Sequence, residues 1–95
     1  MEDIPLNQLT QALARQDVVY AGVFGSVARG EARPTSDVDI LIKFAKPKSL
    51  LDIVRLEREL GALLGREVDL VTEASLSPYI RNDVLGQLHV FYGTR

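Results

Sequence analysis

The spacing of apolar residues along the chain alternates between the periods of helices and of strands. Apolar residues three and four positions apart predict amphipathic helices from about Pro5 to Arg15 and between Ser49 and Gly65. The unbroken apolar run at 18–24 is typical of a strand buried on both faces, whereas residues 38–44 alternate like a strand with one apolar face. The remaining predicted elements are a helical turn at 27–29, a strand at 67–71, a helix from Ser77 to about Leu85 and a strand at 88–92.

Capping residues mark the ends of several predicted helices. Ser49 is placed to accept the backbone N–H of Asp52, whose own carboxylate can reach back in a capping box. Ser77 and Pro78 similarly combine an N-cap with a first-turn proline. Gly65 is expected to stop the long helix, and Gly30 to close the short helical turn in a left-handed conformation.

Helices and strands follow one another along the whole chain, with no repeat, linker or block of like charge. With 95 residues the chain has room for a single core. The sequence therefore predicts one small α/β (α+β) domain that occupies residues 1–95, with helices packed on its sheet.

Composition narrows the class of protein. Eleven basic and 13 acidic residues are interspersed, which disfavours a nucleic-acid groove. No apolar run is long enough to cross a membrane, and the acidic start at Glu2 and Asp3 is unlike a secretory signal. The absence of cysteine favours a reducing compartment. We therefore expect a soluble cytoplasmic protein with no direct nucleic-acid or membrane partner.

Several common chemical motifs are excluded. Gly25 and Gly30 have the glycine spacing of a P-loop, but Glu31 and Ala32 stand where that motif requires Lys and Ser or Thr. The single histidine, His89, has a surface or packing role as its simpler explanation, and without cysteine it cannot supply a zinc site.

Three aspartates form the strongest chemical pattern. Asp37 and Asp39 stand two residues apart at the start of a strand, so their side chains leave one face about 7 Å apart at the backbone. If the strands at 38–44 and 67–71 are neighbours, Asp69 shares that face. Carboxylates this close repel one another unless a cation compensates, and carboxylate oxygens suit magnesium. An aspartate also fits poorly in a strand interior, so Asp39 calls for a functional reason.

A possible phosphate cradle stands at the end of the first strand. Gly25 allows close approach of the backbone to a ligand, and the Ser26 hydroxyl with the N–H groups of the turn can hold phosphate oxygens. Taken singly, a Gly-Ser turn and hydrated strand-end aspartates are both common features. Together they are the parts needed to bind magnesium–nucleoside triphosphate and stabilise attack at phosphorus.

The pattern resembles the polymerase-beta-type nucleotidyltransferase superfamily, and most closely its minimal nucleotidyltransferases, the MntA-like antitoxins encoded beside HEPN-domain toxins. The resemblance extends from about Val18 to Tyr92 and implies that superfamily's fold, with a mixed sheet. Val27 departs from the aromatic residue that many members have at this position. The segments that carry the resemblance are Gly25-Ser26-Val27-Ala28-Arg29-Gly30, Ser36-Asp37-Val38-Asp39-Ile40 and Val68-Asp69-Leu70-Val71.

The resemblance also implies roles for individual residues. Gly25 and Ser26 would hold the triphosphate of ATP, and Asp37 and Asp39 would bind two Mg²⁺ ions. Asp69 would complete the metal site and help to activate the acceptor hydroxyl. The implied reaction transfers AMP from ATP to a tyrosine of a HEPN-type ribonuclease toxin from a neighbouring gene, which silences the toxin.

Two alternatives remain open at this point. The chain could be a non-catalytic antitoxin that neutralises its toxin by complex formation, or it could transfer a nucleotide to a small molecule such as an aminoglycoside. The short chain argues against the small-molecule reaction, because larger members use a further domain to hold base and acceptor. A partner protein is expected to complete the cleft.

Overall fold

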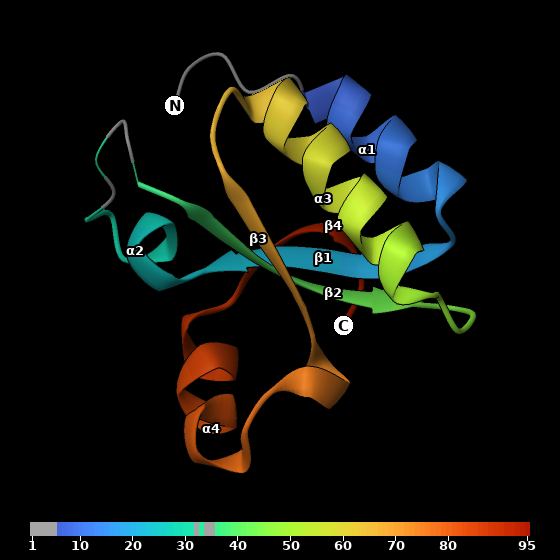
Figure 1. The fold of residues 1–95 in the computed structure, drawn as a ribbon. Coiled ribbons are helices and arrows are strands. Elements are labelled where there is room, and N and C mark those ends of the chain that lie inside the picture. The colour runs from blue at the N-terminus through green and yellow to red at the C-terminus, as the bar shows by residue number, and fades with distance from the viewer. Residues whose placement is uncertain (1–5, 32, 34–35) are drawn as a thin grey trace.

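The computed structural model describes residues 6–31, 33 and 36–95, which form one four-stranded sheet in the order β3-β2-β1-β4 (Figure 1). The sheet is mixed, as predicted, because β1 pairs antiparallel with both β2 and β4 whereas β3 runs parallel to β2. Along the chain the elements are α1 (Leu6–Arg15), β1 (Val18–Phe24), α2 (Gly25–Ala28), β2 (Val38–Phe44), α3 (Leu50–Leu64), β3 (Val68–Thr72), the 3₁₀ turn η1 (Glu73–Ser75), α4 (Pro78–Gln87) and β4 (His89–Gly93).

The predicted elements are present, with differences at their ends. The predicted start of the first helix at Pro5 lies outside the described residues. The short helix begins at Gly25 instead of 27, and η1 was not predicted. The last helix continues through Gly86 to Gln87. Leu85 and Leu88 pack against the sheet on either side of Gly86, and this packing outweighs a glycine penalty of about 1 kcal/mol.

The capping predictions are confirmed. The Ser49 hydroxyl accepts the N–H of Asp52, and the Asp52 carboxylate accepts the N–H of Ser49. Gly65 ends α3 in the left-handed conformation with φ 66°, and Gly30 follows α2 with φ 72°. The Ser77 hydroxyl accepts the N–H of Tyr79 at the start of α4. Local side-chain chemistry therefore sets the start or end of each of these three helices.

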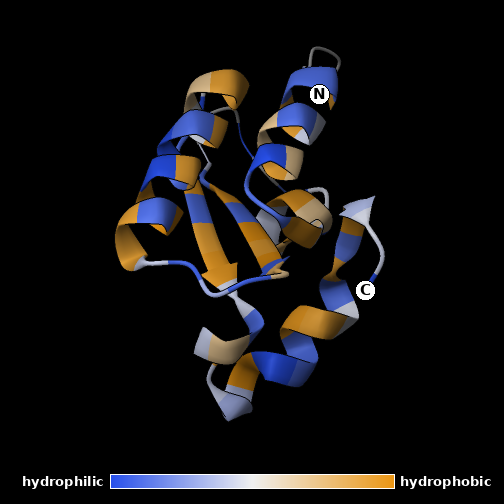
Figure 2. Ribbon diagram, turned by 90° about the vertical axis from the view of Figure 1, so that its right-hand side faces the viewer, coloured by the Kyte–Doolittle hydropathy of each residue, from blue (hydrophilic) through white to orange (hydrophobic). Residues whose placement is uncertain are grey.

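The sheet has two unequal faces. α1 and α3 lie side by side over one face, and α4 lies beyond the other (Figures 1 and 2). The strands at the centre of the molecule are largely apolar (Figure 2). The larger core lies under α1 and α3, and the smaller core lies under α4. The buried members of the larger core are Leu9, Ala12, Leu13, Val18, Ala21, Val38, Ile40, Ile42, Leu56, Leu60, Val68 and Leu70, and those of the smaller are Tyr20, Leu41 and Val84.

The prediction that the first strand is buried on both faces holds for Tyr20 and Ala21 but is wrong for Val19, whose surface is 37% exposed. The pairing of β1 with β2 shifts register between Val18 and Tyr20, and this irregularity turns Val19 outward. β3 is an edge strand of the sheet, and its Leu70 N–H donates to Oε2 of Glu57 at 2.8 Å. A helix side chain therefore occupies part of the hydrogen-bonding edge of β3.

Within the described part of the chain, none of the helices has the length and apolar character that a membrane crossing requires.

Candidate active site

Two of the three predicted aspartates lie directly opposite each other in the sheet. Asp39 of β2 and Asp69 of β3 are register partners in the parallel pair. Leu41 and Val71, two residues further along each strand, both pack in the smaller core under α4. Residues two apart share a face, so Asp39 and Asp69 both lie on the α4 face of the sheet. Asp37 lies two residues before Asp39, at the entry to β2.

The surroundings of Asp39 disfavour its charge. Burial raises the pKa of Asp39, and the carboxylates of Asp69 and Asp37 raise this pKa further, while the charge of Arg29 lowers it. Asp37 and Asp69 are exposed, and Asp39 is half-buried. The three aspartates thus share one electrostatic environment with an excess of negative charge.

The donor set of Asp37, Asp39 and Asp69 matches magnesium in its chemistry. All three are carboxylates, the ligand type that a hard divalent cation prefers, and their mutual repulsion is what a cation would relieve. Among the described residues, no three His, Cys, Asp or Glu side chains are grouped closely enough to hold a metal ion as they stand. The residues therefore fit the ion, although their carboxylates are not closed around one point.

Gly25 brings the end of β1 against Asp39. Phe24, the last residue of β1, is the register partner of Asp39 in β2. Gly25 follows with φ 72°, and a Cβ built at this position would overlap Oδ2 of Asp39. Glycine is therefore favoured for two reasons, its left-handed conformation and the close approach to a carboxylate. Ser26 follows in α2 and is half-buried.

Val27, where many family members have an aromatic residue, lies on the side of the larger core and not on the side of the aspartates. Its side chain packs against the larger core and lines an apolar cavity of about 160 Å³ together with Leu6 and Phe91. A smaller side chain than the usual aromatic residue is accommodated there, away from the carboxylates.

Gln87 is the site residue that the sequence did not indicate. Its side-chain Oε1 accepts the backbone N–H of Gly25 at 3.3 Å and Nη1 of Arg29 at 3.1 Å. Arg29 also pairs with Glu31 at 2.9 Å. His89 is exposed on β4 opposite Val23, in agreement with a surface role. Gln87 stands 62 residues after Gly25 and has no local signature.

The model of the nucleotidyltransferase domain family matches residues 6–89. The chain belongs to this family. The matched region contains both the Gly-Ser turn and the three aspartates.

Individual relatives place the chain more closely. It is 52% identical over 67 residues to the protein adenylyltransferase MntA of Thermococcus cleftensis. The aligned region covers 70% of this chain and 68% of the relative. A solved structure of a candidate minimal nucleotidyltransferase superposes with a TM-score of 0.77 at 44% identity and covers 88% of this chain and 86% of that one. The chain is thus a minimal nucleotidyltransferase and a homologue of MntA, which confirms the family and the fold class expected from its motifs.

A solved toxin–antitoxin complex with AMP-PNP also resembles the chain. The TM-score is 0.81 at 26% identity, and the match covers 96% of this chain and 75% of that one. An ATP analogue and a toxin partner are therefore documented for a structural relative of this fold.

Proposed function

We propose that this protein is a magnesium-dependent adenylyltransferase that acts as an antitoxin by transferring AMP from ATP to a tyrosine hydroxyl of a partner HEPN-type ribonuclease toxin. The observation that carries the proposal is the register of Asp39 with Asp69 on the face where Gly25 contacts Asp39. The 52% identity to the MntA protein adenylyltransferase supports the choice of reaction. The toxin–antitoxin relative with AMP-PNP supports the choice of partner and nucleotide.

Each site residue has a role in this proposal. Gly25 and Ser26 hold the triphosphate, and Asp37, Asp39 and Asp69 hold two Mg²⁺ ions. The ions supply positive charge that stabilises the charge developing around the phosphorus. The backbone at Gly25 can approach a phosphate closely because no side chain intervenes.

The transfer itself breaks one bond and forms another. The tyrosine hydroxyl oxygen attacks the α-phosphorus of ATP, the bond from that phosphorus to the oxygen bridging to the β-phosphate breaks, and pyrophosphate leaves. The hydroxyl proton passes to the carboxylate of Asp69, which is exposed at the site. The product is a phosphodiester that joins the tyrosine oxygen to the 5′ oxygen of adenosine.

The toxin and its setting are part of the same proposal. The toxin completes the cleft that holds the acceptor, and the likeness to a toxin–antitoxin structure with AMP-PNP supports this arrangement. The absence of cysteine supports a cytoplasmic location, where ATP and a ribonuclease target are available.

Label transfer tests the proposed function. The chain is incubated with magnesium, the toxin from the neighbouring gene and ATP labelled at either the α- or the γ-phosphate. The proposal predicts toxin labelling from α-labelled ATP only, loss of that label with Asp39→Asn, and loss of toxin ribonuclease activity as the label accumulates. Labelling from the γ-phosphate, or undiminished labelling by Asp39→Asn, would contradict it.

A growth assay separates catalysis from simple complex formation. The double variant Asp37→Asn, Asp39→Asn is expected to bind the toxin but not to rescue growth from it. Full rescue by this variant would instead support neutralisation by binding alone.

A further inference from the structure

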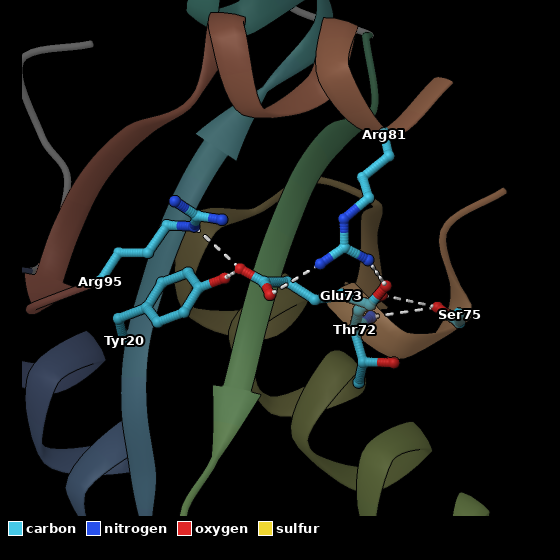
Figure 3. A network of polar contacts seen from close by, with 6 residues as sticks. All are labelled: Tyr20, Thr72, Glu73, Ser75, Arg81 and Arg95. Carbon is cyan, nitrogen blue, oxygen red and sulfur yellow. Dashed lines mark hydrogen bonds and ion pairs between the residues drawn. The ribbon is translucent and has the colours of Figure 1, made fainter. Parts of the chain in front are cut away.

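α4 makes polar contacts near both of its ends, with η1 near its start and with α2 at its end. Near its start, Nη2 of Arg81 pairs with Oε2 of Glu73 at 3.4 Å, and Glu73 also accepts the Tyr20 hydroxyl and Nε of Arg95 (Figure 3). At its end, Gln87 makes the two contacts with Gly25 and Arg29 described above. The position of Gln87 over the Gly-Ser turn is therefore held by contacts at both ends of the helix.

The two groups that Gln87 contacts are donors suited to phosphate. Gly25 has no side chain of its own beside its backbone N–H, and Arg29 carries a positive charge that lowers the pKa of Asp39. A single neutral carbonyl oxygen accepts from both of them. A backbone N–H has one hydrogen, so a phosphate oxygen can take this donor only by replacing Gln87.

We propose that Gln87 is an internal competitor of the nucleotide: its carboxamide oxygen occupies the donors of Gly25 and Arg29 that the triphosphate takes, and its displacement lowers nucleotide affinity. This inference rests on the proposed function, because it requires the triphosphate to lie on Gly25. It goes further by naming a residue of α4 that regulates access to the site.

Replacement of the Gln87 carboxamide by a phosphate oxygen is favourable overall, but the hydrogen bonds that Gln87 loses reduce the affinity for the nucleotide. Hydrogen bonds to a charged phosphate oxygen are stronger than those to a neutral amide, so the triphosphate wins the competition. The half-buried Gln87 carboxamide can then turn toward water. A typical net hydrogen-bond contribution corresponds to a reduction of nucleotide affinity by about two- to tenfold.

Titration calorimetry with AMP-PNP and magnesium tests this role on the full chain. Gln87→Met keeps a side chain of similar length without the competing oxygen, and we expect its Kd to fall by about two- to tenfold. Gln87→Glu places a carboxylate beside Arg29 and the phosphates, and we expect its Kd to rise about tenfold or more. Gln16→Met, a half-buried glutamine just after α1, is the matched control and should leave Kd unchanged.

The same titration with the Arg29→Met variant shows whether the effect of Gln87 on nucleotide affinity depends on Arg29. In Arg29→Met the gain from Gln87→Met is expected to shrink, because one of the two donors is already absent. Thermal melting of each variant reports on the fold, so that a loss of structure is recognised.

The outcomes separate the inference from the proposed function. An unchanged or raised Kd for folded Gln87→Met overturns the inference, while the proposed function stands if the parent chain still labels the toxin and Asp39→Asn does not. No AMP-PNP binding by the parent chain overturns both.

Discussion

The two faces of the sheet use alternate residues of the same strands for different purposes. Under α1 and α3, Val38, Ile40 and Ile42 of β2 are at most 1% exposed and belong to the larger core. On the α4 face, the same strand presents Asp39, then Leu41, then exposed Lys43. Stability is therefore concentrated on one face, and the second face is covered only in its middle.

The difference shows how a small domain accommodates charged chemistry. The smaller core of Tyr20, Leu41 and Val84 separates two polar regions, the aspartates at one end and the contacts of Glu73 at the other. A charge within the larger core would have to be desolvated without a partner. Beyond the edge of α4, the aspartates keep access to solvent and to ligands.

The largest effect on activity is expected for Asp39→Asn, a substitution on the α4 face of the sheet. Asp39→Asn keeps the shape of the side chain but removes its charge, and toxin labelling is expected to fall at least about a hundredfold. Its melting temperature should not fall, because burial and Asp69 already disfavour the charge. A folded Asp39→Asn variant with parent-level labelling would remove Asp39 from the catalytic site.

Ile40→Ala makes the corresponding test on the face under α1 and α3, because Ile40 follows Asp39 directly in β2. Ile40 is 1% exposed in the larger core, so this change is expected to reduce the free energy of unfolding by about 2–4 kcal/mol. Urea denaturation measures the loss. The labelling rate per folded molecule should stay near that of the parent chain, and a loss as large as that of Asp39→Asn would show that the faces are not separate in function.

Two glycines with the same φ test the cradle at a smaller scale. Gly25→Ala and Gly30→Ala both place a side chain at φ 72°, at a cost of about 1 kcal/mol in stability. Only at Gly25 does the new Cβ overlap Asp39, since nothing lies within 4 Å at Gly30. We expect roughly a tenfold or greater loss of labelling for Gly25→Ala alone. Equal activities would contradict the close approach of the turn to Asp39.

The smallest effect concerns the other polar end of the α4 face and depends on pH. Burial and then the hydrogen bond to Glu73 raise the pKa of Tyr20 to about 12. The neutral hydroxyl therefore contributes stability below pH 10, and this contribution is lost as pH rises toward 12. By pH 11 the parent chain should have lost roughly 1 kcal/mol relative to Tyr20→Phe.

Urea denaturation of both proteins at pH 9 and pH 11 checks this difference. Parallel losses in parent and variant would show that the Tyr20 hydroxyl does not carry the alkaline transition. On the acid side, the Tyr20 hydrogen bond lowers the pKa of Glu73, so the contribution of Glu73 is present above its ordinary pKa and is lost as pH falls through its lowered value.

Local patterns were sufficient to predict much of the fold. The alternation in β2 predicted correctly that Asp39 leaves the face of Ile40, and the Ser49–Asp52 capping box fixed the start of α3. The neighbouring position of Asp69 was conditional on strand pairing, which the parallel register with Asp39 now supplies. These features depend on residues close in sequence or on a periodicity of two.

Contacts between distant segments could not be predicted in the same way. Gln87 meets Gly25 across 62 residues, and Tyr20 meets Glu73 across 53. The end of α4 was placed before Gly86 because local propensity disfavours glycine, whereas packing by Leu85 and Leu88 decides the outcome. Tertiary contacts therefore determine the part of the site contributed by α4.

In the proposed mechanism, Asp37, Asp39 and Asp69 jointly hold the divalent cations beside the triphosphate. The most direct measurement is a crystal structure with Mn²⁺ and a non-hydrolysable ATP analogue, in which anomalous scattering locates the metal. We expect two manganese peaks bound by these three carboxylates, with the triphosphate on Gly25 and Ser26. Manganese bound elsewhere, or bound without Asp69, would contradict it.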